Sequence, residues 1–300
     1  MRAPLVLVHT DAYAGWAFSS AHPTQGRRFG GARARLLEHA STRGLRVDEV
    51  HSDLLPSREL MERVHTPAYV DEVIVGGVCR EWNGPRPELG HLAHRMVGGT
   101  MLAAQALVDG RTLTAVHFAG AKHHAMRDHS SGFCVFNDLA VTATHLLEGD
   151  MRRISVIDID AHHGDGTEAL LRDHPRVQTL SVHDATIFPG TGHVDEVSHE
   201  VFNEPLPGGA GDDQLMAAVS RFIGEVRRFS PDLLMLATGA DGHATDPLSS
   251  LTYTIDGMEA AVCSVRAAFP TLPILVGGAG GYQPDDVTPE VWARMAVAAA

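Results

Sequence analysis

Six short apolar runs recur along the chain, and they limit the folds that are open to it. Each run is shorter than a typical helix and rich in β-branched and aliphatic side chains. Continuous apolar character of this kind is typical of central strands that are buried on both faces of a sheet. We therefore predict strands at residues 5–8, 113–118, 154–159, 177–182, 233–237 and 274–276.

The segments between these runs carry apolar residues at helical spacing. We predict helices at residues 92–107, 138–147, 213–229 and 258–269. Alternation of strands and helices indicates βαβ units, and hence a mostly parallel sheet between two helical layers, a three-layer α/β/α sandwich. The chain contains no long linker, charge block or internal repeat, so we expect one domain over residues 1–300. Ligands of such sheets bind beyond the carboxyl ends of the strands.

Composition excludes several other classes of protein. No apolar run approaches the roughly 18 residues that span a membrane, and the apolar stretch at the N-terminus is too short for a signal peptide. A formal net charge of −13 disfavours nucleic-acid binding. The three cysteines include no CxxC pair, which favours a reduced, cytoplasmic location.

The richest polar cluster directly follows the strand predicted at 154–159. The sequence there is IDIDAHHGDG (157–166). Residues two apart in an extended segment point the same way, so Asp158, Asp160 and His162 would share one face. Carboxylates and an imidazole that converge at a strand end are typical of a metal site, and mixed oxygen and nitrogen ligands suit zinc.

Three other predicted strands also end in polar or glycine-rich segments. Asp241 follows the strand at 233–237, His123 and His124 follow the strand at 113–118, and Tyr282 ends the glycine run after 274–276. Taken singly, each has an ordinary structural interpretation: a helix cap for the aspartate, and packing for the histidines and the tyrosine. Beside the first cluster, Asp241 supplies a third protein ligand, and a catalytic zinc takes three and keeps one position open.

Six of these segments resemble, in order and at similar spacing, the motifs of the histone deacetylase family. The resemblance covers nearly the whole chain, and its details are most similar to the bacterial acetoin-utilisation branch. The fold that it implies is the arginase/deacetylase sandwich. The motifs are GAKHHA (120–125), GFCVFND (132–138), IDIDAHHGDG (157–166), FPGTG (188–192), GADGHATDPL (239–248) and GGAGGY (277–282), with HPTQGRRF (22–29) and VHTPAYV (64–70) as further matches.

The resemblance implies a zinc-dependent amide hydrolase, and it assigns a role to each matching position. The catalytic Zn²⁺ would be held by Asp160, His162 and Asp241. A general acid–base pair, a carbonyl hydrogen-bond donor and a narrow substrate tunnel complete the implied site. The pair is His123 and His124, oriented by Asp158 and Asp165; the donor is Tyr282; the tunnel residues are Phe133, Phe188, Gly132, Leu248 and Arg28, with Arg28 beside the acetate-release channel.

The family also binds a structural potassium ion, and the implied ligands are present in this chain. They are Asp158, Asp160, His162, Ser181 and Val182. Because two aspartates and one neutral histidine cancel the charge of Zn²⁺, its bound water is acidified less than at an all-histidine site and needs a general base. The substrate that the resemblance implies is an acylated amine, foremost acyl-lysine in a protein.

Other functions stay open at this stage. A small acetylated metabolite or a polyamine is an alternative substrate, although Leu248 stands where polyamine deacetylases carry an acidic residue. A binuclear manganese ureohydrolase shares the fold, but its motifs need further carboxylates where this chain has His163 and His243. A non-catalytic acyl-lysine binder would lack a ligand, a histidine of the pair or the tyrosine. Lys122 departs from the family, and the sequence leaves its role and the oligomeric state open.

Overall fold

The computed structural model describes residues 3–300, and one parallel sheet runs through this part of the chain. Met1 and Arg2 of the predicted domain lie outside the described residues. The strand order is β2-β1-β3-β8-β7-β4-β5-β6, and every neighbouring pair is parallel. The strands are β1 (Leu5–His9), β2 (Val47–His51), β3 (Thr114–His117), β4 (Ile154–Asp158), β5 (Val177–Asp184), β6 (Val201–Leu206), β7 (Leu233–Ala237) and β8 (Ile274–Gly277).

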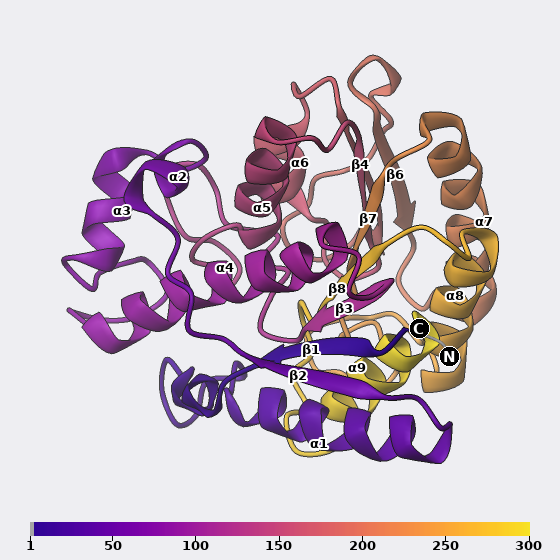
Figure 1. Cartoon of the computed structure of the whole chain (residues 1–300), viewed down its shortest axis with the longest axis horizontal. Coiled ribbons are helices and arrows are strands. Elements are labelled where there is room, and N and C mark those ends of the chain that lie inside the picture. Colours follow the sequence, from indigo (N-terminus) through magenta and orange to yellow (C-terminus); the bar gives the residue numbers. More distant parts are fainter. Residues whose placement is uncertain (1–2) are drawn as a thin grey trace.

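Helices cover both faces of this sheet (Figure 1). One layer holds α1 (Arg27–Thr42), α7 (Asp212–Phe229), α8 (Ile255–Ala268) and α9 (Val287–Ala298), and these helices pack on one another in the order α1-α9-α8-α7. The other layer holds α2 (Arg58–Glu62), α3 (Pro67–Ile74), α4 (Pro87–Val108), α5 (Asp138–Glu148) and α6 (Asp165–Leu171). Two short 3₁₀ helices, η1 (Asp11–Gly15) and η2 (Val197–His199), lie in connections. The predicted three-layer α/β/α sandwich is therefore confirmed.

All six predicted strands are present, and two further strands form the edges of the sheet. β2 reads VDEVH and is only half-buried, and β6 contains Asn203, Glu204 and Pro205. Strands at an edge pack on fewer neighbours, so their sequences carry polar residues and lack the continuous apolar character of the central strands. The helices α1, α2, α3, α6 and α9 were also not predicted.

The sheet topology brings four polar segments to one place. The neighbours β3, β8, β7 and β4 end in register, with Gly277 opposite both His117 and Ala237, and Ala237 opposite Asp158. Because the strands are parallel, the segments that follow them leave the same edge of the sheet. None of the helices within residues 3–300 is long and apolar enough to cross a membrane.

Candidate metal centre and catalytic site

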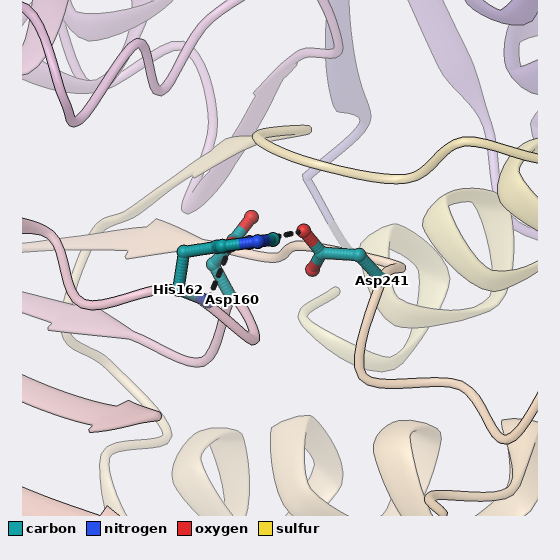
Figure 2. A group of neighbouring side chains, drawn as sticks. All are labelled: Asp160, His162 and Asp241. Carbon is teal, nitrogen blue, oxygen red and sulfur yellow. Dashed lines mark hydrogen bonds and ion pairs between the residues drawn. The ribbon is translucent and has the colours of Figure 1, made fainter. Parts of the chain in front are cut away.

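Three buried side chains converge where β4 and β7 end. Asp160 and His162 follow β4, and Asp241 follows β7. One donor atom from each lies within 4.8 Å of the others. Nδ1 of His162 is 2.9 Å from Oδ2 of Asp241 and 3.2 Å from Oδ1 of Asp160. Figure 2 shows the imidazole directed between the two carboxylates.

Backbone groups hold both carboxylates in place. Asp241 accepts a hydrogen bond from the N–H of Ala161 (3.0 Å), and Asp160 accepts one from the N–H of Gly280 (2.6 Å). A Cβ atom on Gly280 would lie 2.1 Å from Oδ2 of Asp241, and one on Gly239 would lie 2.1 Å from Oδ2 of Asp160. The glycines of the motifs therefore leave the space that the two carboxylates occupy.

The charges of the three residues fit a divalent cation. Burial lowers the pKa of His162, but its hydrogen bonds with Asp160 and Asp241 outweigh burial and raise that pKa to about 11. Burial and the charge of Asp160 raise the pKa of Asp241. Without a metal, the protonated imidazole supplies the positive charge between the two buried carboxylates; a metal ion that displaces this proton would take its place. Carboxylate oxygen and imidazole nitrogen are both ligands that zinc accepts.

Two histidine–carboxylate pairs lie beside these residues. Nδ1 of His123 is 2.6 Å from Oδ2 of Asp158, and Nδ1 of His124 is 2.6 Å from Oδ1 of Asp165. The two imidazole rings are 4.0 Å apart. A carboxylate at Nδ1 fixes the tautomer and leaves Nε2 for a second partner.

The two histidines differ in protonation. Burial lowers the pKa of His123, but the charges of Asp158 and Asp160 outweigh burial and raise that pKa to about 9. Burial and the charge of His123 lower the pKa of His124 to about 4. The pKa values of the two histidines are thus shifted in opposite directions, as an acid and a base that act in one reaction require.

A further carboxylate, which sequence analysis did not single out, holds the loop that carries the histidines. Asp138, at the start of α5, accepts hydrogen bonds from the N–H groups of Ala121 (2.9 Å) and Lys122 (2.7 Å). It also accepts one from the hydroxyl of Thr100 (2.5 Å). Ala121 has a φ of 60°, a conformation that an alanine rarely adopts without such support. The sequence signal was weak, because an aspartate in the first turn of a helix is common.

Aromatic side chains lie beside the triad and the histidine pair. The ring of Tyr282 lies 6.5 Å from that of His162 and 5.8 Å from that of Phe133. The ring of Phe188 lies 5.0 Å from that of His124 and is 49% exposed. Of these rings, Phe188 is the one that reaches solvent, and Phe133 packs against Tyr282.

The other predicted tunnel residues lie close to this aromatic group. A Cβ atom on Gly132 would lie 2.3 Å from the ring of His124, so the chain passes close to the histidine there. Asp246, a second residue missed from the sequence, accepts hydrogen bonds from the N–H groups of Tyr282 (2.8 Å) and of the half-buried Leu248 (3.0 Å). Arg28 is buried and donates to the carbonyl of Gly281 (2.6 Å).

The residues predicted to bind potassium include two members of the triad, Asp160 and His162, and their neighbours Asp158, Ser181 and Val182. Asp158 of β4 is opposite Ser181 of β5, and both line one small cavity. The N–H of Asp160 donates to Oδ1 of Asp158 (3.0 Å), and Val182 is buried next to Ser181. His162 lies two residues after Asp160 in the segment that follows β4.

Comparison with known proteins gives consistent matches. The sequence model of the histone deacetylase domain matches residues 22–299. The acetoin utilization protein AcuC of Bacillus subtilis (strain 168) is 32% identical, over 97% of this chain and 80% of that protein. Histone deacetylase 8 of Xenopus laevis is 34% identical over 75% of each chain. The alignment with AcuC of Staphylococcus aureus (strain MRSA252) spans 61% of that relative's length.

A solved structure shares the fold of this chain. The crystal structure of the HDA15 HD domain superposes with a TM-score of 0.86 at 22% sequence identity, covering 99% of this chain and 88% of the other. The domain match spans most of the chain and agrees with the relatives found by sequence. The chain therefore belongs to the histone deacetylase family, and within it to the branch of the bacterial AcuC proteins.

Proposed function

We propose that this protein is a zinc-dependent amide hydrolase that removes acetyl or other acyl groups from acylated amines, foremost from acyl-lysine side chains. One observation carries the proposal: the buried triad Asp160, His162 and Asp241 lies directly beside two histidines whose Nδ1 atoms are held by carboxylates. A metal triad and an acid–base pair in one buried site suit hydrolysis of an unactivated amide.

Each residue of the site would have a distinct task. Zinc, when bound by the triad, supplies the Lewis acid that polarises the amide carbonyl and acidifies a water molecule. One histidine of the pair accepts a proton from the attacking water, and the other gives a proton to the nitrogen of the departing amine. Tyr282 donates a hydrogen bond to the carbonyl oxygen as negative charge develops on it. Asp158 and Asp165 keep the imidazoles oriented.

The surrounding residues would position the substrate. Phe133 and Phe188 flank a narrow tunnel that suits an extended, uncharged acyl-lysine chain, with Gly132, Leu248 and Arg28 along it. We also propose a structural K⁺ held by Asp158, Asp160, His162, Ser181 and Val182. The facing positions of Asp158 and Ser181 on β4 and β5 support that ion.

The position of two histidines disfavours a binuclear ureohydrolase. Such an enzyme would use His163 or His243 toward a second ion. His163 is instead hydrogen-bonded to Thr191 (2.8 Å) and Glu168 (3.0 Å), and His243 is hydrogen-bonded to Thr245 (2.9 Å). Both side chains are therefore engaged in local hydrogen bonds.

A turnover and metal analysis tests the proposed function. Zinc-loaded protein is assayed with acetyl-lysine peptides, acetylated polyamines and agmatine, and its metal content is measured by elemental analysis. We expect one zinc ion per chain and release of acetate from the peptides. Asp241→Asn should lose the zinc and the activity, because it removes a charged ligand.

Asp232→Asn is the matched control for Asp241→Asn, because Asp232 precedes β7 at the opposite end of the strand. This control should keep both zinc and activity. Turnover of agmatine with two metal ions per chain would support the ureohydrolase instead. Full zinc content without hydrolysis of any amide would make the protein a binder.

A further inference from the structure

A chain of four buried side chains leads to Asp138, which holds the loop after β3. Its members come from distant parts of the sequence: Tyr13 of η1, Ser52 after β2, Thr100 of α4 and His117 at the end of β3. The hydroxyl of Tyr13 is 2.7 Å from that of Ser52 and 3.0 Å from Nε2 of His117. Nδ1 of His117 is 2.9 Å from the hydroxyl of Thr100, which is 2.5 Å from Oδ2 of Asp138. The side chains thus form one continuous line of hydrogen bonds.

Two glycines leave the space that this line of side chains occupies. A Cβ atom on Gly99 of α4 would lie 2.4 Å from Nε2 of His117. A Cβ atom on Gly120 would lie 2.7 Å from the hydroxyl of Thr100 and 2.8 Å from Oδ2 of Asp138. The backbone of α4 and that of the loop after β3 therefore pass directly against the polar chain, where a side chain would displace it.

The hydrogen bonds of this chain all point toward Asp138. A carboxylate accepts and does not donate, so the hydroxyl of Thr100 donates to Asp138, and its oxygen accepts from Nδ1–H of His117. Burial lowers the pKa of His117 to about 3, so its imidazole is neutral and carries no proton on Nε2. Nε2 then accepts from the hydroxyl of Tyr13, and the oxygen of Tyr13 accepts from the hydroxyl of Ser52.

Asp138 connects this chain to the catalytic histidines. The oxygen that accepts from Thr100 also accepts from the N–H of Ala121 (2.9 Å), and the other oxygen accepts from the N–H of Lys122 (2.7 Å). His123 follows directly. Without the Thr100 hydroxyl, the carboxylate would lose its only side-chain donor among the described residues, and it would hold the two N–H groups less firmly.

We propose that Thr100, His117 and Tyr13 are positioning residues, which hold the loop after β3 and its histidine pair in the reactive conformation through Asp138. The Thr100 hydroxyl is the decisive contact, because it is the member of the chain that touches the carboxylate. Hydrogen bonds to a charged group are roughly twice as strong as those between neutral groups. The effect on turnover rests on the proposed function, whereas the effect on the loop does not.

Amide hydrogen exchange tests the effect on the loop without any need for turnover. Thr100→Val removes the hydroxyl at nearly the same shape, and Thr100→Ser keeps it. In zinc-loaded protein, the N–H groups of Ala121 and Lys122 should exchange about tenfold faster in Thr100→Val than in the wild type, as measured by NMR. Thr100→Ser should restore slow exchange. Thr142→Val is the matched control, since the buried Thr142 hydroxyl of α5 has no partner within residues 3–300.

Steady-state kinetics on an acetyl-lysine peptide tests the effect on turnover. Thr100→Val should lower kcat by about tenfold and leave KM and zinc content close to wild type, because reacting groups tolerate little displacement. Since this effect passes through Asp138, adding Thr100→Val to Asp138→Asn should lower kcat no further than Asp138→Asn alone. A general weakening of the core would instead add the two losses. Thr142→Val should keep the wild-type kcat, and thermal unfolding verifies that each variant is folded.

The position of the proton on His117 tests the direction of the chain, and it needs no variant of Thr100. NMR shifts of the imidazole nitrogens distinguish the two neutral tautomers, and the signal of His117 is identified by its absence from His117→Gln. We expect the proton on Nδ1 at pH 7 and at pH 5, because the pKa of His117 is about 3. A proton on Nε2 in the wild type would overturn the chain.

The outcomes separate this proposal from the proposed function. Faster exchange at Ala121 and Lys122 in Thr100→Val, without hydrolysis of any amide by the wild type, would overturn the proposed function and keep the hold on the loop. Hydrolysis of acetyl-lysine, with wild-type exchange and kcat in Thr100→Val or with losses that add in the double variant, would overturn the positioning role alone.

Discussion

At the scale of single residues, the environment of Tyr282 decides what its hydroxyl can do. Burial, together with the charges of Asp241 and Asp160, raises the pKa of Tyr282 well above its ordinary value. The raised pKa favours the protonated phenol, which can act as a hydrogen-bond donor. The bond from its N–H to Asp246 (2.8 Å) fixes the backbone that carries it.

Removal of this hydroxyl should affect turnover and leave the metal in place. We expect Tyr282→Phe to lower kcat by about 100- to 1000-fold, because it deletes one donor to the developing oxyanion. Zinc content should not change. Tyr253→Phe is the matched control, since the buried Tyr253 hydroxyl has no partner within the described residues. Steady-state kinetics on an acetyl-lysine peptide measures the effect, and wild-type kcat in Tyr282→Phe would remove this role.

Some site residues could be predicted from local sequence spacing, whereas others could not. Asp160 and His162 stand two positions apart after one strand, so local geometry alone predicted that they belong together. Asp241 lies 79 positions from His162, and only the resemblance to a family paired them. Asp138 and Asp246 were missed because each bonds to backbone N–H groups, a role that leaves no distinctive spacing in the sequence.

At the scale of secondary-structure elements, the order of the strands determines the site. Apolar runs predicted where the central strands lie along the chain, but nothing in these runs indicates that β8 lies between β3 and β7. Neighbours in a parallel sheet are set by how the crossover helices pack, which is a property of the whole chain. The four segments that carry the site are adjacent only because of this order.

The loop after β3 depends on two helices for its conformation. Asp138 of α5 bonds to the N–H groups of Ala121 and Lys122 and to Thr100 of α4. The loop, α4 and α5 are thus connected through the buried carboxylate of Asp138, which bonds to the loop directly before the histidine pair. A small shift of this loop would move both imidazoles, and a displacement of about 1 Å at a reacting group can reduce a rate by about 100-fold.

Asp138→Asn should therefore impair catalysis from outside the site. An asparagine keeps one acceptor but turns an NH₂ group toward an N–H donor, so one loop contact is lost. We expect kcat to fall by about tenfold or more, with KM and zinc content close to wild type. Asp213→Asn, in the first turn of α7 and exposed, is the control and should not change kcat. A normal kcat with a higher KM would contradict the positioning role.

At the scale of the whole molecule, buried histidines make the stability depend on pH. The chain contains 19 histidines, and several lie in the interior away from the triad. Burial lowers the pKa of His65 to about 4, that of His117 to about 3 and that of His183 to about 4. In the folded protein these side chains are neutral near pH 5, whereas in the unfolded chain they take up protons below about pH 6.5.

The free energy of unfolding should therefore fall as the pH is lowered from about 6.5 to 4. The unfolded state binds more protons than the folded state in that range, so protonation favours unfolding. A folded pKa of about 4 for His65, against about 6.5 when unfolded, gives a loss of about 2 kcal/mol between pH 7 and pH 5. Nδ1 of His65 donates to the carbonyl of Met126 (2.9 Å), and its Nε2 accepts from the N–H of Asn137 (3.1 Å), so the neutral form is the one that fits.

His65→Gln isolates this contribution, because glutamine offers a donor and an acceptor and does not titrate. The melting temperature should decrease less between pH 7 and pH 5 in the variant than in the wild type, whatever the stability of the variant at pH 7. His91→Gln changes an exposed histidine, so its melting temperature should decrease by as much as that of the wild type. Any effect of pH on metal binding is common to all three proteins, so it cancels in the comparison. An equal decrease in His65→Gln and the wild type would mean that His65 takes up a proton in the folded protein, and the neutral bridge between Met126 and Asn137 would then be wrong.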